Sequence, residues 1–412
     1  MLQDFINKHF FSLFLFTLIF GLLLYGTIGF DFIDEICAAL LLVLFGYALF
    51  KSPEWPINKA FLIVIGVFLF YLCYSICIDS NTKAAIITDF IIQFKPYLAL
   101  FCVYSLQPNF SANQKKVLRM ICIFFWCILF LLAGIEMVKP HTLEAVMGHN
   151  TYFAAGVIAV SLCYLYTSEF STKNKIIFIL MLSIGLISGR SKFYGFFALS
   201  VMAIIFSPYI QYFKLNFKTI LVILITLALV MFVAWKKISF YFVEGIVGDA
   251  EEDSIARFVL YSKSILILKD YFPFGSGFGS YATYASGLYY SDIYSQYGID
   301  NVWGISKKFY SFIADTYYPS LAQFGITGVL LYITFWIYII KKAFHFFKKT
   351  LQAKLMIIVI LLVCFFAIEG TTDSTITTHR GLFMMMLLGL MMGEMKNIVQ
   401  NQIQQHEDTS NK

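Results

Sequence analysis

Charged residues are scarce in this chain. They make up only 13% of its 412 residues, whereas 60% are hydrophobic and 19% are aromatic. A soluble domain of this length carries roughly 25% charged residues, so this chain has too little polar surface to cover a water-soluble globule. Apolar runs of about 20 residues recur along almost the whole length, and each could cross about 30 Å of hydrocarbon. The composition excludes a soluble globular protein and predicts a polytopic membrane protein.

The apolar runs lack the alternation of polar and apolar residues that the strands of a transmembrane barrel show. In lipid the backbone groups must pair within each segment, so we expect these runs to be helices. We therefore predict an all-α, polytopic transmembrane helical bundle of about twelve spans. The predicted spans are residues 9–29, 33–50, 59–79, 84–106, 116–137, 150–167, 173–189, 192–213, 217–235, 319–340, 354–370 and 379–395.

Cysteine is missing from the one long loop. All eight cysteines fall in apolar segments, where we expect them to pack, and they show neither a disulfide framework nor a metal-ligand spacing. The net charge of +6 would suggest nucleic acid in a soluble protein. Here the basic residues lie mostly at helix ends, so membrane topology explains them more simply. We expect no metal, no cofactor and no nucleic-acid partner.

The short loops outside the bundle contain little lysine and arginine. With the N-terminus inside, the outer loops hold only Lys83, Lys139, Arg190, Lys192 and Arg380, and the inner loops hold many more. Because cytoplasmic loops carry the excess of basic residues, both termini are predicted to be cytoplasmic. The first apolar run is too long for a signal peptide core and has no cleavage site, so we expect a retained anchor.

This topology divides the chain into four parts. We predict transmembrane helices 1–9 in residues 1–235, an external loop in 236–318, helices 10–12 in 319–396 and a frayed cytoplasmic polar tail in 397–412. A loop of this length without a role is uncommon. We expect no separate soluble domain in it, and interfacial anchoring explains many of its tyrosines.

The loop contains one predicted helix, ARFVLYSKSILILKDY, with Asp253-Ser254 as its cap and Pro273 with Gly275 after its end. Phe258, Ile265 and Leu268 fall roughly on one face of it. This face is predicted to lie on the membrane surface or on the bundle.

Two basic segments are candidates for an anion site. Ser188-Gly189-Arg190-Ser191-Lys192 places two cations among small residues at the outer boundary, and arginine can grip phosphate oxygens with two hydrogen bonds. The alternative is an ordinary short turn. The second is Arg257 followed by Pro273-Phe274-Gly275-Ser276-Gly277-Phe278-Gly279, whose spaced glycines could let the backbone approach a ligand or could simply form a tight turn.

Acidic residues and histidines supply the candidate base. Asp315 stands where the long loop re-enters the membrane, and partial burial there would raise its proton affinity and suit it to act as a general base. The alternative role is a helix N-cap. His149, and Glu369, Asp373, His379 and Arg380 around the last outer loop, are further outer candidates. Within the fourth span, Asp89 and Lys95 are costly in lipid, so we expect them to face the bundle or a cavity.

Taken in order, these segments resemble the O-antigen ligase/polymerase family of bacterial surface polysaccharide assembly. That family is similar in having about twelve spans, one large late external loop and an S-x-R-type motif, matched here by Ser188-Gly189-Arg190-Ser191. Its Arg-aromatic loop opening is matched by Arg257-Phe258, and its P-x-x-G-x-G-type turn by residues 273–279. Its H/D-N-x-Y-x-x-x-L-x-x-x-G-x-x-G element is matched by Asp315-Thr316-Tyr317-Tyr318-Pro319-Ser320-Leu321-Ala322-Gln323-Phe324-Gly325-Ile326-Thr327-Gly328. The resemblance covers roughly residues 150–340 by motif and the rest only by hydropathy.

The resemblance implies a C-type glycosyltransferase of the bacterial inner membrane, with the long loop in the periplasm and no need for a metal ion. Its donor would be a glycan on undecaprenyl pyrophosphate. Its further partners would be membrane lipids, a flippase and a chain-length regulator. By position, Arg190 and Arg257 would neutralise the leaving pyrophosphate and Asp315 would serve the acceptor hydroxyl. The residues assigned to substrate binding are Lys192, Tyr194, Gly275, Gly277, Gly279, Tyr317, His149, His379 and Arg380.

One departure from the family bears on the activity. Ligases usually carry histidine where this chain has Asp315. This departure leaves His149 and His379 as alternative bases. It also favours a polymerase of lipid-linked repeat units over a ligase that acts on lipid A core. Two other classes stay open. Asp89 and Lys95 within a span favour a flippase or transporter, and a scaffold without activity would not need the arginines.

Overall fold

The computed structural model describes residues 2–29, 32–52, 58–212 and 252–410, with the side chains of 252–255 and 406–410 left aside. Within these ranges the chain is helical, and the nearest approach to a strand is an isolated bridge between Ser306 and Phe309. The prediction of an all-helical protein is confirmed. The ninth predicted span, residues 217–235, and the first part of the long loop lie outside the described residues.

The described elements follow one another along the chain. They are α1 (Leu2–Leu18), η1 (Ile19–Leu23), α2 (Tyr25–Ile28), α3 (Ile33–Lys51), α4 (Lys59–Cys77), α5 (Lys83–Leu106), α6 (Ala112–Val138), α7 (Thr142–Met147), α8 (Asn150–Thr167), α9 (Thr172–Ser183), η2 (Ile184–Ser188), α10 (Ser191–Ile205), η3 (Ser207–Tyr212), α13 (Glu252–Asp270), α14 (Tyr284–Leu288), α15 (Ile293–Gln296), α16 (Leu321–Thr350), α17 (Ala353–Glu369), η5 (Thr375–Thr377) and α18 (His379–Ser410).

Seven of the described helices are long and apolar enough to cross a membrane. They are α1 with η1, α3, α4, α5, α6, α16 and α18. Other predicted spans coincide with the shorter helices α8, α9 with η2, α10 and α17. The chain is therefore a membrane protein by the length and composition of its helices.

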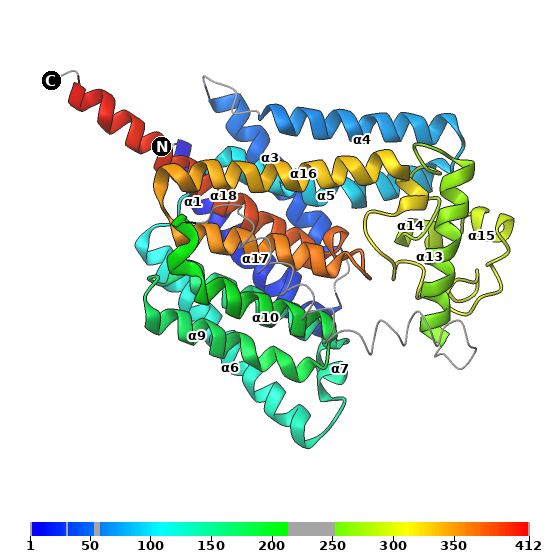
Figure 1. The fold of residues 1–412 in the computed structure, drawn as a ribbon, viewed down its shortest axis with the longest axis horizontal. Helices are drawn as coiled ribbons and strands as arrows, with labels where there is room; N and C mark the ends of the chain where they lie inside the picture. Colours follow the sequence, from blue (N-terminus) through cyan, green and yellow to red (C-terminus); the bar gives the residue numbers. More distant parts are fainter. Residues whose placement is uncertain (1, 30–31, 53–57, 213–251, 411–412) are drawn as a thin grey trace.

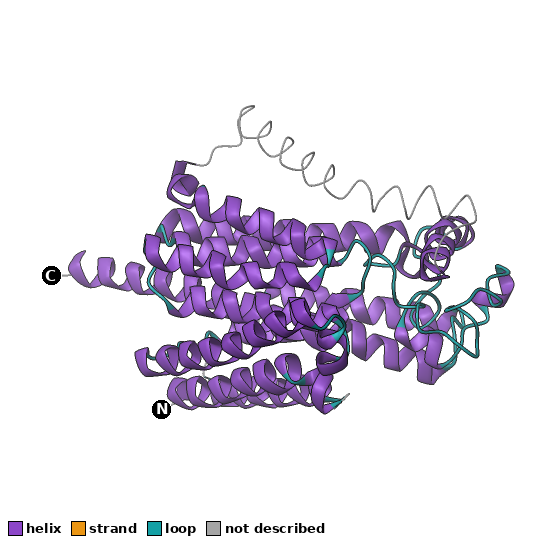
Figure 2. Ribbon diagram, turned by 90° about the horizontal axis from the view of Figure 1, so that it is seen from below, coloured by secondary structure: helices purple, strands orange, loops and turns teal. Residues whose placement is uncertain are grey.

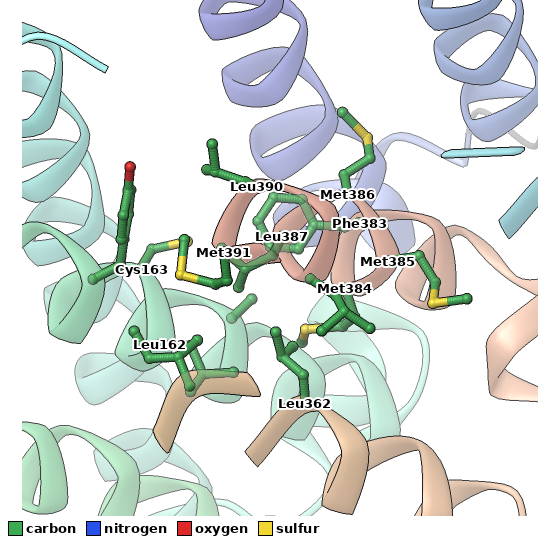
Figure 3. Packing of buried hydrophobic residues seen from close by; sticks show 14 of the residues in the cluster. Leu162, Cys163, Leu362, Phe383, Met384, Met385, Met386, Leu387, Leu390 and Met391 are labelled. Carbon is green, nitrogen blue, oxygen red and sulfur yellow. The ribbon is translucent and has the colours of Figure 1, made fainter. Parts of the chain in front are cut away.

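Helix α18 forms the centre of the bundle. It is apolar on all sides between Leu382 and Met392, and a helix of that kind must be surrounded by other helices. Figure 3 shows Met384 and Met391 of α18 among Leu162 of α8 and Leu362 of α17, and these side chains are fully buried. Helix α5 packs along α18, and its second half is buried as well.

The long helices run side by side, and the connecting segments gather at their ends (Figures 1 and 2). Both termini lie at one end of the bundle, and α7 with α13, α14 and α15 lies at the opposite end (Figure 1). We refer to the end that carries α13–α15 as the loop end.

Helix α13 differs from the predicted loop helix. It begins at Glu252, so Asp253 and Ser254 lie inside its first turn and do not precede it as a cap. Its fully buried residues include Ala256, Leu260 and Ile267, whereas the predicted apolar face is partly outside, with Ile265 64% exposed. The loop supplies partners for the other side of this helix, and contact of the exposed Ile265 side with the membrane surface stays a prediction.

The described part of the loop has a small hydrophobic core of its own, where we had expected no separate folded unit. Tyr281 and Tyr294 are fully buried in it, and their rings stack at 5.6 Å. Tyr284 and Trp303 are more than half exposed and remain available for an interface. The tyrosines therefore divide into core residues and surface residues, which composition alone could not separate.

Several helices extend beyond their predicted ends. Helix α1 starts at Leu2, α16 continues to Thr350, and α18 continues to Ser410. The segment from Asn397, predicted to be frayed, is thus a continuation of α18. Helices extend past the apolar stretch because their backbone bonds do not depend on apolar side chains.

Candidate functional site

The glycine-rich turn at residues 273–279 packs against protein and not around an open space. The amides of Gly275, Ser276 and Gly277 donate to the carbonyl oxygens of Tyr271, Ala322 and Gln323 at 2.8–2.9 Å. The amides of Phe278 and Gly279 donate to Ser75 and Asp89 at 2.7 Å. Protein acceptors occupy these amides, which favours the tight-turn alternative, and substrate binding by Gly275, Gly277 and Gly279 stays a prediction.

Asp89 anchors this turn to the bundle. Its carboxylate is fully buried in α5 and accepts hydrogen bonds from the Gly279 amide, from Gln93 and from the Gln323 side chain of α16. Three donors around one buried carboxylate offset the cost of removing it from water. The prediction that Asp89 faces the bundle interior is confirmed, and its role in the structure is to hold the turn.

Lys95, the second charged residue of α5, is also buried and has carboxylate partners. Its ammonium group pairs with Asp34 and lies 2.7 Å from Glu35, both at the start of α3. The sequence analysis did not identify Asp34 and Glu35 as partners, because nothing in the spacing of α3 and α5 shows that these residues meet.

Arg257 and Asp315 form an ion pair at the loop end. The guanidinium Nη2 of Arg257, on α13, lies 3.0 Å from Oδ2 of Asp315, which precedes α16. Burial raises the pKa of Asp315, and so does the nearby Asp373 carboxylate, whereas Arg257 and Lys192 act in the opposite direction. Asp315 therefore combines a raised proton affinity with a partner that could be drawn away by an anion.

A second group of charges joins α10, the end of α17 and the start of α18. Lys192 lies 2.8 Å from Glu369 and 3.9 Å from Asp373. Asp373 also pairs with Arg380 at 3.0 Å and accepts a hydrogen bond from Thr375 at 2.8 Å. Burial would raise the pKa of Asp373, but Arg380 and Lys192 hold it below its usual value. The charges around Asp373 therefore favour its anionic form, whereas burial favours proton uptake by Asp315.

Arg380 retains unused hydrogen-bonding capacity. Its side chain is 6% exposed, and in the described part of the chain its Nε and Nη1 atoms have no hydrogen-bond partner. Its guanidinium also lies 5.5 Å from the ring of Tyr152. Neighbouring His379 is stacked on Tyr25 at 3.5 Å, and its Nε2 atom is likewise without a partner among the described residues. Buried donors without partners are uncommon and point to a missing acceptor.

Arg190 lies in the same region through His149. Burial lowers the pKa of His149, and the positive charges of Arg190 and Arg380 lower it further. Arg190 directly precedes α10, and within the described ranges its guanidinium forms no ion pair. His149 caps α8, where its Nδ1 atom accepts the Thr151 amide at 3.1 Å. The acceptor role explains why a neutral imidazole is favoured there.

Three hydrogen bonds hold the long loop against the last outer loop and against itself. Tyr261 of α13 donates to the Thr371 carbonyl at 2.7 Å, and the Tyr318 amide donates to the Gly370 carbonyl at 2.8 Å. Tyr317 donates to Ser264 at 2.7 Å, and its ring stacks on Tyr261 at 5.0 Å. These contacts keep Arg257 and Asp315 next to Asp373.

The predicted site residues thus fall into three groups. Arg190, Lys192, Arg257, Asp315, His149, His379 and Arg380 share one charged region, which we call the outer charge cluster together with Glu369 and Asp373. Tyr317 supports this cluster from the loop, and Tyr194 is exposed one turn after Arg190 on α10. The glycines belong to the packed turn described above.

Tyr25 and Tyr152, whose rings contact His379 and Arg380, are not among the predicted site residues. Tyr25 lies near the N-terminus and Tyr152 in α8, so no local motif links them to α18. Among the described residues, no group of three or more His, Cys, Asp or Glu side chains is arranged to hold a metal ion.

Comparison of the chain with protein-family models finds no match, and comparison with curated proteins finds no relative. A function must therefore be argued from the motifs and from the chemistry of the outer charge cluster.

Proposed function

We propose that the protein is a glycosyltransferase that polymerises a surface polysaccharide at the periplasmic face of the bacterial inner membrane. It would transfer a growing glycan from undecaprenyl pyrophosphate to a hydroxyl of another lipid-linked repeat unit. The observation that carries the proposal is the outer charge cluster, which gathers Lys192, Arg257 and Arg380 from three separate elements around Asp315 and Asp373. Arg190 adds a cation without an ion pair in the described part of the chain.

The proposed topology has about twelve crossings with both termini in the cytoplasm. It is supported by the seven long apolar helices, by the four shorter ones that coincide with predicted spans, and by the position of both termini opposite the loop end (Figure 1). In this topology the outer charge cluster lies at the periplasmic boundary, where a lipid-linked donor would present its diphosphate.

The cations would bind the diphosphate and stabilise the charge that develops on it. In the reaction the acceptor oxygen forms a bond to the anomeric carbon, and the bond between that carbon and the diphosphate oxygen breaks. The electron pair leaves with the diphosphate, so cations that contact it favour the transition state. Arg380, with two buried nitrogen atoms lacking acceptors in the described structure, has donors to offer.

Asp315 is the proposed acceptor of the hydroxyl proton. Its raised pKa suits this role, but its ion pair with Arg257 opposes proton uptake. A bound diphosphate would compete for Arg257 and weaken that pair, so Asp315 would become a stronger base when the donor is present. This coupling would limit proton transfer to the occupied site.

Two alternatives stay in view. A ligase would use the same cluster but transfer the glycan to lipid A core, and Asp315 in place of the usual ligase histidine favours the polymerase. The charges that favoured a transporter, Asp89 and Lys95, have partners within the protein, so they offer less support for transport. A transporter would also be expected to bind its cargo near the middle of the membrane.

A chain-length assay tests the proposal. Purified protein in proteoliposomes would receive a labelled lipid-linked repeat unit, and products would be separated by gel electrophoresis. We expect a ladder of longer lipid-linked glycans, reduced about 100-fold or more by Arg190→Ala, since removal of one transition-state contact has effects of this size. Lys83→Ala, an exposed cation at the start of α5, is the matched control and should leave the ladder unchanged. Transfer to lipid A core without a ladder would favour the ligase, and lipid movement without a new bond would favour the transporter.

A further inference from the structure

A long apolar groove runs along the outside of α4, α5 and α16. Its volume is about 760 Å³. Helix α4 packs mainly against α5 and has little buried surface of its own, and residues of α4 and α16 line the groove. Val64, Phe68, Phe101 and Phe335 contribute to its apolar lining. A groove of this kind in the hydrocarbon region must be filled by lipid chains.

The charges of the groove are confined to one of its ends. Tyr318 and Pro319 line the end near the loop, whereas Lys59, Lys342 and Lys396 line the end near the termini. A lipid whose phosphate lies at the loop end would find no cation among the groove-lining residues there. The distribution therefore favours a lipid that enters with its headgroup at the end near the termini, which is the cytoplasmic end in the proposed topology.

Lys342 and Lys396 both lie near the ring of Tyr104. Their ammonium nitrogens lie 4.9 Å and 5.4 Å from the centre of the same Tyr104 ring. Lys342 also donates to the Tyr338 hydroxyl at 2.7 Å, and within the described ranges neither lysine forms a salt bridge. Two like charges around one ring are held more favourably when an anion shares them.

We propose that this groove binds an anionic phospholipid of the inner leaflet. Its acyl chains would lie along the apolar lining, and its phosphate would be held by Lys342 and Lys396, with Lys59 at the rim. This site is separate from the outer charge cluster and does not depend on the proposed transferase activity.

Native mass spectrometry of the delipidated full chain tests the site. The protein would be titrated with phosphatidylglycerol and, separately, with phosphatidylcholine. We expect preferential binding of phosphatidylglycerol, and roughly tenfold weaker binding in the double variant Lys342→Gln and Lys396→Gln, because each lysine near an anionic headgroup strengthens binding severalfold. The control is Lys348→Gln with Lys349→Gln, two exposed lysines at the end of α16 that do not line the groove.

A third variant, Val67→Trp, would fill the groove and should reduce retention of phosphatidylglycerol while leaving the lysines in place. Thermal unfolding of each variant checks that it folds. Equal binding of both phospholipids, or an unchanged preference in the Lys342 and Lys396 variant, would overturn the proposal. A competition with undecaprenyl pyrophosphate gives a further test. If this lipid displaces phosphatidylglycerol equally well from the Lys342 and Lys396 variant and from the Lys348 and Lys349 control, the proposal is overturned, and the groove would instead hold the prenyl chain of the donor.

Discussion

Asp315 and Asp373 are neighbouring carboxylates in different electrostatic surroundings. Asp373 is bound by Arg380, Lys192 and Thr375, so its negative charge is well compensated. Asp315 has Arg257 as its ion-pair partner, and burial together with Asp373 raises its pKa. Two carboxylates whose pKa values are pushed in opposite directions suit different roles, one as a fixed anion and the other as a proton acceptor.

The role of Asp315 gives the first prediction. Asp315→Asn keeps the shape but cannot take up a proton, so the rate of polymer formation should fall by about 10²–10⁴-fold. In the wild type, activity should fall as the pH is lowered, because Asp315 becomes protonated. Since the pKa of Asp315 is raised, this fall should be centred above pH 3.8, the ordinary pKa of an aspartate side chain. The rate of ladder formation against pH measures both effects. Full activity of Asp315→Asn would exclude Asp315 as the base.

His149 gives a second prediction, on stability. Its pKa in the folded protein lies below the ordinary value of 6.5, so the unfolded chain takes up a proton more readily. Its contribution to stability is therefore complete above pH 6.5 and is lost as the pH falls from 6.5 through the folded-state pKa. Protonation also removes the Nδ1 acceptor that caps α8.

The matched variant is His149→Asn, since asparagine caps helices well and does not titrate. Thermal unfolding between pH 7.5 and pH 5.5 should show a larger loss of stability for the wild type than for the variant. Parallel curves for the two proteins would contradict this account of His149.

The sequence identifies candidate charged residues at the outer boundary, but it does not show which residues pair. The excess of cations at an outer boundary singled out Arg190, Lys192 and Arg380, because outer loops are otherwise poor in them. The pairing of Lys192 with Glu369, 177 positions later, depends on how α10 packs on α17 and could not be read from spacing.

Among the elements, the turn at residues 273–279 is the joint between the long loop and the bundle. Gly275 and Gly325 have φ values of +81° and +62° and lie against each other. A Cβ atom on Gly325 would stand 2.1 Å from the Pro273 carbonyl oxygen. The motif glycines therefore allow two backbone segments to touch, and Asp89 fixes the turn from α5.

This contact gives a third prediction. Gly325→Ala should lower the free energy of unfolding by more than the roughly 1–3 kcal/mol expected for a strained backbone conformation, because a clash is added. Gly298→Ala is the matched control, since Gly298 has a φ of +66° with open space around it. Thermal unfolding in detergent compares the two variants. Equal destabilisation would show that backbone strain alone matters and that the packed turn does not.

Hydropathy predicted where the seven long apolar helices lie, although α1, α16 and α18 extend past their predicted ends, since in lipid an apolar run leaves the backbone few alternatives to a helix. It did not show which residues of α13 pack inside the loop, namely Ala256, Leu260 and Ile267. Their partners are loop residues such as Ile293, Ile299 and Ile313, which come later in the chain. No periodicity within α13 reveals a partner that distant.

For the whole molecule, the described part of the long loop is a folded unit fastened to the bundle at several points. The Asp89 contact holds one side of it, and the Tyr261 bond to Thr371 holds α13 against the last outer loop. The outer charge cluster lies between these parts, with Arg257 from the loop and Arg380 from the bundle. The position of the loop therefore sets the distance between Arg257 and Arg380 in the outer charge cluster.

The fourth prediction concerns this fastening. Tyr261→Phe removes one hydrogen bond but keeps the ring that stacks on Tyr317. We expect kcat/KM for the lipid-linked repeat unit to fall about fivefold, in line with roughly 1 kcal/mol for a neutral hydrogen bond. Tyr284→Phe, at an exposed loop tyrosine, should leave it unchanged. Equal kinetics for both variants would show that this bond does not position the cluster.

In the proposed function, the outer charge cluster holds the diphosphate of a lipid-linked donor. An experimental structure of the protein with undecaprenyl pyrophosphate measures this most directly through the positions of the two phosphorus atoms. We predict that phosphate oxygens lie within hydrogen-bond distance of Arg190 and of Arg380 Nε or Nη1, with Arg257 turned from Asp315 toward the diphosphate. A headgroup bound out of reach of all three arginines, for example beside Lys342 and Lys396, would contradict the account.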